Sequence, residues 1–138
     1  MSKFVYLDAC VVIYLLEECG EFSQRIRAFL AQNEDAILCV SPLVRLEVLS
    51  KPLKTNNAQL VEDYETFLAA QQWLSVDDKA FDLALQLRSK YGLKTPDALH
   101  LAIATLYGCA EFWTNDHRLQ GVAQTVNRNI LQDAHQSA

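Results

Sequence analysis

The sequence lacks several features that mark special classes of protein. It contains no basic segment followed by an apolar run and a cleavage site, so we expect no secretory signal. No uninterrupted apolar run approaches the roughly 18 residues that a transmembrane helix needs. We therefore expect a soluble, cytoplasmic protein with no membrane partner.

Cysteine spacing and net charge count against two further classes. The cysteines, Cys10, Cys19, Cys39 and Cys109, form no CxxC or CxxH pair, so neither a zinc site nor a disulfide framework is expected. The formal net charge is −5, whereas proteins that coat nucleic acid through surface charge are usually basic. This balance still suits an enzyme that gathers its acids in one metal site and keeps its bases on the rim.

The chain alternates strand-like and helix-like segments. Its 138 residues suggest a single domain, which we assign to residues 1–132, followed by a frayed tail at 133–138. Strand-forming runs cover 4–8, 36–40, 73–76 and 111–114, with a weak fifth near 129–131. Helical patterns cover 10–18, 21–33, 42–51, 58–72, 78–91 and 95–107, with a polar loop at 51–57.

This alternation predicts an α/β fold of three layers, with a central parallel sheet of four to five strands flanked by helices. In such sheets, ligand sites lie beyond the carboxyl ends of the strands. Three acids occupy suitable places. Asp8 and Asp116 each follow a predicted strand, and Asp97 lies in the first turn of a helix that is apolar almost all round. Each also has an ordinary interpretation, as a helix cap or as a partner of the helix dipole.

Glu47 has an independent physical argument. On a helical wheel that turns about 100° per residue, Leu43 at about 0° and Val44 at about 100° flank Glu47 at about 40°. A carboxylate on this apolar arc is expected to be partly buried, and a buried charge needs a cation or hydrogen-bond donors. The alternative is an exposed pair with Lys51, four residues further on.

Together these acids predict a metal site. Clustered carboxylates repel one another and have raised pKa values unless a cation neutralises them. Mg²⁺ or Mn²⁺ suits oxygen ligands, and either ion can activate a water for attack on a phosphodiester. A metal-dependent nuclease is therefore the predicted activity.

Each acid also lies within a recognisable motif. The segments are YLDACVVI at 6–13, RLEVL at 45–49, TPDALHLA at 95–102 and WTNDHRL at 113–119. In this order, and over nearly the whole chain, they resemble the four acidic motifs of PIN-domain proteins. Size and spacing look most like those of the VapC-type ribonuclease toxins of bacterial toxin–antitoxin pairs.

The resemblance implies a Mg²⁺- or Mn²⁺-dependent endoribonuclease that acts on RNA, forms a homodimer and is inhibited by a cognate antitoxin. Carried over residue by residue, it implies an acidic metal site of Asp8, Glu47, Asp97 and Asp116, supported by Thr114 and Asn115. One departure stands out. The family often has hydroxyl-bearing or amide residues after its first Asp, where this chain has Ala9 and Cys10.

Basic residues near the motifs are candidates for contacts with RNA phosphates, namely Arg45, Arg118 and Lys94. His100, three residues after Asp97, is expected to be a packed structural histidine, with a zinc or base role as the alternative.

Other functions remain to be weighed. A receiver domain would need a lysine after the last strands, and an aspartyl phosphatase would need a second Asp where Cys10 stands. A non-catalytic PIN-like binding module stays open, as does a housekeeping RNA or DNA nuclease of the same fold.

Overall fold

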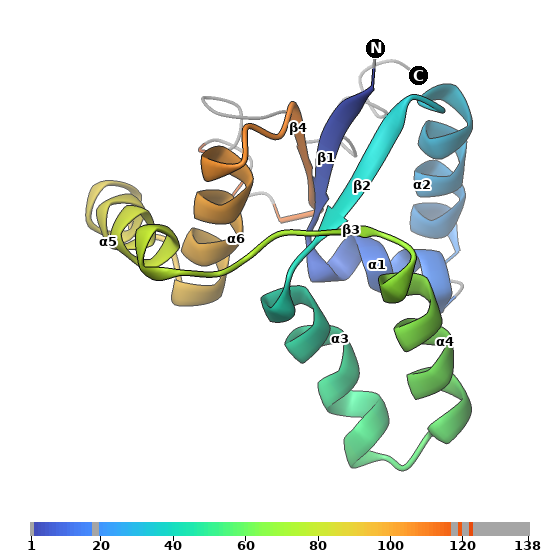
Figure 1. Cartoon of the computed structure of the whole chain (residues 1–138). Helices are drawn as coiled ribbons and strands as arrows, with labels where there is room; N and C mark the ends of the chain where they lie inside the picture. The colour runs from blue at the N-terminus through green and yellow to red at the C-terminus, as the bar shows by residue number, and fades with distance from the viewer. Residues whose placement is uncertain (1, 18–19, 117–118, 120–121, 123–138) are drawn as a thin grey trace.

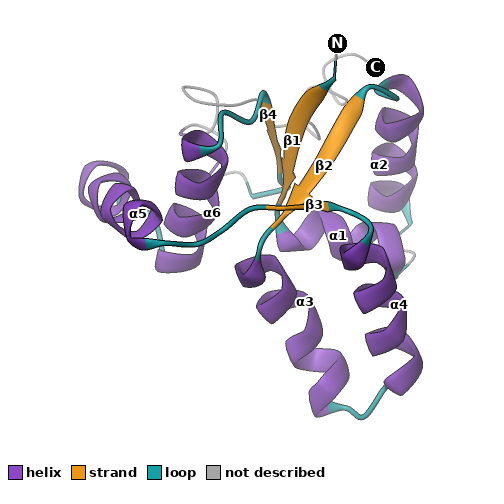
Figure 2. Cartoon of the chain, viewed as in Figure 1, coloured by secondary structure: helices purple, strands orange, loops and turns teal. Residues whose placement is uncertain are grey.

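A computed structural model describes residues 2–17, 20–116, 119 and 122 of the chain. Its centre is a parallel sheet of four strands, β1 (Lys3–Leu7), β2 (Ala36–Val40), β3 (Gln72–Trp73) and β4 (Glu111–Trp113). The strands lie in the order β3-β2-β1-β4 (Figure 2). The predicted α/β class with a central parallel sheet is confirmed. The proposed fifth strand near 129–131 and the tail at 133–138 lie outside the described residues.

Six helices flank the sheet in the described part of the chain. They are α1 (Ala9–Leu16), α2 (Glu21–Gln32), α3 (Pro42–Lys54), α4 (Ala58–Ala69), α5 (Asp78–Tyr91) and α6 (Thr95–Leu106). The chain steps outward from β1 to β3 and then crosses back to β4. Right-handed crossovers therefore place α5 and α6 on the opposite face from α1 and α2 (Figure 1). None of these helices is long and apolar enough to cross a membrane.

The innermost elements are β1 and α6. Val5, Tyr6 and Leu7 of β1 have no exposed surface, because β1 pairs on both sides and is covered on both faces. Helix α6 is buried over seven consecutive residues, from Ala98 to Ala104, as its apolar sequence predicts. Polar side chains carried on these two elements are consequently held in a close-packed interior.

Two local predictions differ from the structure. Helix α3 continues through Pro52 to Lys54 instead of ending near residue 51. Proline interrupts a helix by removing one N–H and crowding the preceding turn. Pro52 lies in the last turn of α3 and is buried, and the burial of its ring compensates for part of that cost. The second difference concerns the strand predicted at 73–76, which the structure places at Gln72–Trp73 as β3. At the start of α6 the N-cap is Lys94, and the Thr95 hydroxyl accepts a hydrogen bond from Arg88 Nη1 at 2.9 Å.

A partly buried ion pair joins β1 to β4 at the amino end of the sheet. Lys3 Nζ lies 2.5 Å from Glu111 Oε2 and also donates to Asn33 Oδ1 at 3.0 Å. Trp113 Nε1 donates to the other oxygen of Glu111 at 2.9 Å. Glu111 is only 3% exposed, so its charge depends on these partners.

We expect Lys3→Met to destabilise the fold by about 1–3 kcal/mol, because it removes the ammonium that pairs with the buried Glu111 carboxylate. The free energy of unfolding should be measured by chemical denaturation. Lys79→Met, at an exposed position in the first turn of α5, is the matched control. A Lys3→Met protein within about 0.5 kcal/mol of the wild type would show that the pair does not stabilise the fold.

Candidate active site

Asp8 stands directly after β1 and is held from two sides. It is the N-cap of α1, and its Oδ1 accepts a hydrogen bond from the backbone N–H of Ala9 at 2.7 Å. Its Oδ2 accepts from the hydroxyl of Thr114 at 2.7 Å. Asp8 is 9% exposed. The cap role and the proposed ligand role, which the sequence leaves as alternatives, are therefore compatible, because each oxygen keeps a second lone pair.

Thr114 connects Asp8, in the first motif, to the fourth motif of the chain. This residue follows β4 and is fully buried. Its hydroxyl donates to Asp8 and accepts from the backbone N–H of Asp116 at 3.1 Å. The Sγ atom of Cys10 lies 4.0 Å from the same hydroxyl. The hydroxyl that is missing after Asp8 in the sequence is thus replaced by one that arrives from β4.

Glu47 reaches the same place from α3. Its side chain is 33% exposed, in agreement with the partial burial that the wheel predicts, and its Oε1 hydrogen-bonds to Nε2 of His100. His100 itself is 1% exposed and lies on α6. The second nitrogen of its ring, Nδ1, is 2.7 Å from the hydroxyl of Tyr6.

Three side chains form the tightest group. One ligand atom each from Asp8, Glu47 and His100 lies within 4.8 Å of the other two, the only such group of three or more among the described residues. Nε2 of His100 lies 3.8 Å from Asp8 Oδ1. Two carboxylates and an imidazole at this separation are suitable ligands for a divalent cation.

The other two predicted acids are near neighbours of His100 and Thr114 in the sequence. Asp97 is half-buried in the first turn of α6, three residues before His100 and so close to the same helix face. Asp116 is half-buried, two residues beyond Thr114, and its Oδ1 accepts from the backbone N–H of Leu119 at 3.4 Å. Asn115, which lies between Thr114 and Asp116 in the sequence, donates to the hydroxyl of Tyr14 at 3.1 Å. The roles of all three residues remain predictions.

The negative charge of the site is confined to carboxylates. Burial raises the pKa of the Tyr6 phenol well above its usual value, and the charges of Asp8 and Glu47 raise it further. Burial, followed by the charge of Asp8, raises the pKa of the Cys10 thiol to about 12. Both groups therefore stay protonated at neutral pH, and Cys10 is unsuited to act as a thiolate nucleophile.

His100 is the member of the group that sequence reasoning assigned a structural role. A signal for it was present: a histidine in a helix that is apolar all round must find buried partners. Its partners lie 53 and 94 residues away in the chain, on α3 and β1, so no local spacing could identify them.

The candidate RNA contacts are placed differently from one another. Arg45 forms a bidentate ion pair with Glu65 of α4 on the surface, in which Nε donates to Oε1 at 2.9 Å and Nη2 donates to Oε2 at 2.8 Å. Lys94 is exposed at the N-cap of α6, three residues before Asp97. Arg118 lies outside the described residues.

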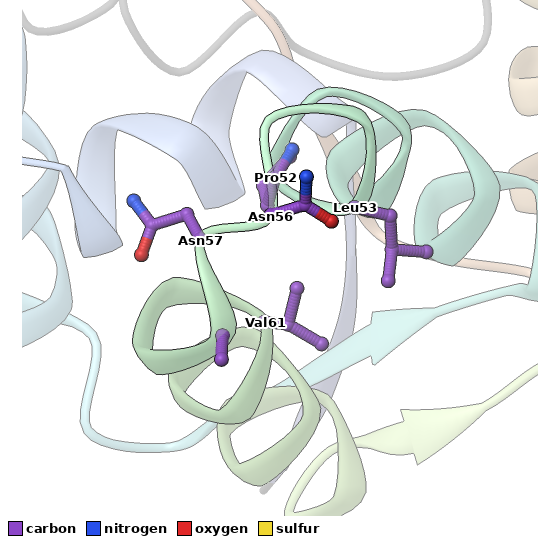
Figure 3. Close-up of a pocket in the computed structure, with 6 residues that line it drawn as sticks. Pro52, Leu53, Asn56, Asn57 and Val61 are labelled. Atoms are coloured by element: carbon purple, nitrogen blue, oxygen red, sulfur yellow. The ribbon is translucent and has the colours of Figure 1, made fainter.

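A separate pocket lies at the turn between α3 and α4 (Figure 3). Its lining is Pro52, Leu53, Asn56, Asn57, Ala58 and Val61. None of these side chains is titratable, and none belongs to the acidic group. The pocket therefore offers a surface for contact but no chemistry of its own.

The chain belongs to the PIN domain family, whose profile matches residues 5–124. Comparison with curated protein sequences finds no significant match. Among solved structures, the DNA-bound VapBC of Salmonella typhimurium superposes with a TM-score of 0.73 at 21% identity, over 94% of this chain and 97% of that one.

Two further structures show the same fold. VapC20 of Mycobacterium tuberculosis, described as a toxin that cleaves the sarcin-ricin loop, has a TM-score of 0.71 at 10% identity and covers 86% of this chain and 94% of its own. FitAcB of Neisseria gonorrhoeae has a TM-score of 0.66 at 19% identity, over 92% and 98%. Because the identities are this low, the structural similarity establishes the shared fold alone.

We expect Thr114→Val to weaken binding of Mn²⁺ by about 10- to 100-fold, because Asp8 loses the donor that orients its Oδ2. Valine keeps the shape of threonine and removes only the hydroxyl. Isothermal titration calorimetry of the purified protein measures the effect. Thr105→Val, which removes a hydroxyl bonded to the Leu101 carbonyl near the other end of α6, should bind like the wild type. If Thr114→Val binds Mn²⁺ as tightly as Thr105→Val and the wild type do, the role of Thr114 is refuted.

Proposed function

We propose that this protein is a Mg²⁺- or Mn²⁺-dependent endoribonuclease and the toxin of a type II toxin–antitoxin system. The observation that carries the proposal is the meeting of Asp8 and Glu47 at the carboxyl edge of the sheet, in a chain of the PIN domain family. These two acids come from distant parts of the sequence, and their charges repel unless a cation lies between them.

The donor set fits a hard divalent cation. Asp8, Glu47, Asp97 and Asp116 would hold it through carboxylate oxygens, which Mg²⁺ and Mn²⁺ prefer. When bound, such an ion supplies an activated water and charge neutralisation at a phosphodiester. The protein's own contribution is orientation: Thr114 and the Ala9 N–H fix Asp8, and the one-third exposure of Glu47 leaves the site open to solvent and substrate.

Lys94 is the strongest described candidate for holding the RNA backbone. It is exposed and one turn from Asp97, so an ammonium at this place would bind a phosphate next to the acids. Arg45 would have to exchange its pairing with Glu65 for a phosphate, which makes it the weaker candidate.

The cytoplasmic toxin assignment and the antitoxin partner rest on the motif resemblance and on the named relatives. Solved neighbours include a toxin–antitoxin complex from Klebsiella pneumoniae and a DNA-bound VapBC2 from Rickettsia felis. By analogy, the partner of this chain would be an antitoxin encoded beside it. A homodimer is proposed on the resemblance alone.

We expect the purified protein, freed of any antitoxin, to cleave RNA with Mg²⁺ or Mn²⁺ and to stop when the metal is chelated. Asp97→Asn should reduce cleavage by at least about 100-fold while the protein stays folded, because a ligand charge is lost at the metal. Cleavage of a labelled RNA pool on a gel and circular dichroism provide the two measurements.

Asp78→Asn is the matched control, since Asp78 is an exposed acid in the first turn of α5. Both changes weaken a helix-dipole interaction, by about 0.3–1 kcal/mol each. Only Asp97→Asn is expected to abolish cleavage. Wild-type cleavage by Asp97→Asn would refute the site assignment, and a wild type that cuts DNA but no RNA would support the DNA nuclease alternative.

Expression of the wild-type gene alone should arrest growth, and co-expression of the adjacent upstream gene should relieve the arrest. Asp97→Asn should be harmless yet still bind the antitoxin, because the change alters one side chain of the metal site. Growth curves and co-purification measure these outcomes. A protein that is harmless and binds no neighbouring gene product, but cleaves RNA, would be a housekeeping nuclease.

A further inference from the structure

His100 lies at the centre of a buried chain of hydrogen bonds that links three of the four acidic motifs. Nε2 of the ring bonds to Glu47, and Nδ1 lies 2.7 Å from the Tyr6 hydroxyl. The Tyr6 hydroxyl lies 2.8 Å from Ser41 Oγ, which accepts from the backbone N–H of Val44 as the N-cap of α3. The chain thus runs from the start of α3, through β1 and α6, and back to the second turn of α3.

The partners of the ring decide where its proton lies. A carboxylate oxygen can only accept, so Nε2 must carry a hydrogen to bond with Glu47. Nδ1 then accepts from the hydroxyl of Tyr6, which lies 2.7 Å away. Tyr6 in turn accepts from the Ser41 hydroxyl. When the bonds run from Ser41 to Tyr6, from Tyr6 to His100 and from His100 to Glu47, each donated hydrogen has an acceptor and the imidazole ring carries a single N–H.

The two acids differ in how firmly their own elements hold them. Asp8 is short and is fixed by the Ala9 N–H and the Thr114 hydroxyl. Glu47 is longer by a methylene, stands on the surface of α3 and is one-third exposed. Without an anchor its carboxylate would sample several rotamers in solvent. The His100 ring holds the Glu47 carboxylate near Asp8, because its Nε2 bonds to Glu47 and lies 3.8 Å from Asp8 Oδ1.

We propose that His100, oriented by Tyr6, is a positioning residue that holds the Glu47 carboxylate beside Asp8 in the geometry that receives the metal. This role rests on the metal-dependent function proposed above. It also assigns Nε2 as a hydrogen-bond donor to Glu47, which excludes that nitrogen from ligating the metal in this arrangement. The role acts through Glu47, and its consequences must therefore disappear when the Glu47 carboxylate is removed.

Binding of Mn²⁺ to the full-length protein, measured by isothermal titration calorimetry, tests the proposal. His100→Leu should weaken binding by about 10-fold or more, as loss of an orienting partner commonly does. His100→Gln, whose amide N–H can occupy the place of Nε2–H, should recover most of the affinity. In a Glu47→Ala background, His100→Leu should cause no further loss. Tyr6→Phe keeps the ring of Tyr6 and should show a smaller loss than His100→Leu.

Two spectroscopic measurements separate positioning from direct ligation. The ¹⁵N shifts of His100 in the metal-free protein should show Nε2 protonated and Nδ1 not. Pulsed electron paramagnetic resonance of bound Mn²⁺ should show no ¹⁴N coupling from an imidazole, and a strong coupling would overturn the proposal in favour of ligation. Circular dichroism checks that each variant is folded, and Tyr6→Phe, for which a loss of affinity is expected, keeps the test decisive if His100→Leu is not.

The proposal is overturned if folded His100→Leu, or folded Tyr6→Phe where His100→Leu does not fold, binds Mn²⁺ as the wild type does while Glu47→Ala does not. It is also overturned if His100→Leu loses as much affinity in the Glu47→Ala background as in the wild type. Both results leave the nuclease function standing. A wild type that neither binds Mn²⁺ nor cleaves RNA would instead refute the proposed function, and the positioning role with it.

Discussion

The parallel pairing of β1 with β4 is the contact on which the site depends. Leu7 pairs with Trp113, and the backbone N–H of Asp8 donates to the Trp113 carbonyl at 3.0 Å, which extends the ladder one residue past the strand. Thr114 then lies beside Asp8 with its hydroxyl on Oδ2. A slip of one residue would turn Thr114 to the other face of the sheet. Strand register thus determines whether the first and fourth motifs meet.

Two buried acids of the central strands are stabilised in opposite ways. Glu111, at the amino end of the sheet, is paired with the ammonium of Lys3, so its charge is neutralised within the fold. In the described part of the chain, Asp8 at the carboxyl end bonds to an amide N–H and a hydroxyl, both neutral. The first arrangement stabilises structure. The second keeps a negative charge available and makes a cation the natural complement.

Much of this architecture was predictable, because the signals that determine it are local. Strand-forming runs, helix caps and the apolar run of α6 lie within a few residues of the elements they specify, and four strands and six helices form close to the expected places. The wheel of α3 also placed Glu47 on a partly buried arc, and its side chain is 33% exposed. These inferences needed only periodicity and the rule that buried charges need partners.

What sequence patterns missed depends on contacts between distant segments. The bond from His100 to Glu47 joins α6 to α3, and the bond from His100 to Tyr6 joins α6 to β1. A helix pattern predicts that His100 is buried, but it does not say which side chains face it. The passage of α3 through Pro52 is similar, since burial of the proline ring against the core offsets a local preference to end the helix.

The residues after Asp8 show why a motif is best judged in three dimensions. Ala9 and Cys10 supply no hydroxyl, which suggests weak support for the first acid when only its own motif is considered. The structure supplies the hydroxyl from Thr114, with Cys10 packed 4.0 Å from it. The orientation of Asp8 is therefore set by the Ala9 N–H at the start of α1 and by the hydroxyl of Thr114, which follows β4. Since Thr114 also accepts from the Asp116 backbone, one hydroxyl fixes the first acid and the segment that carries the fourth.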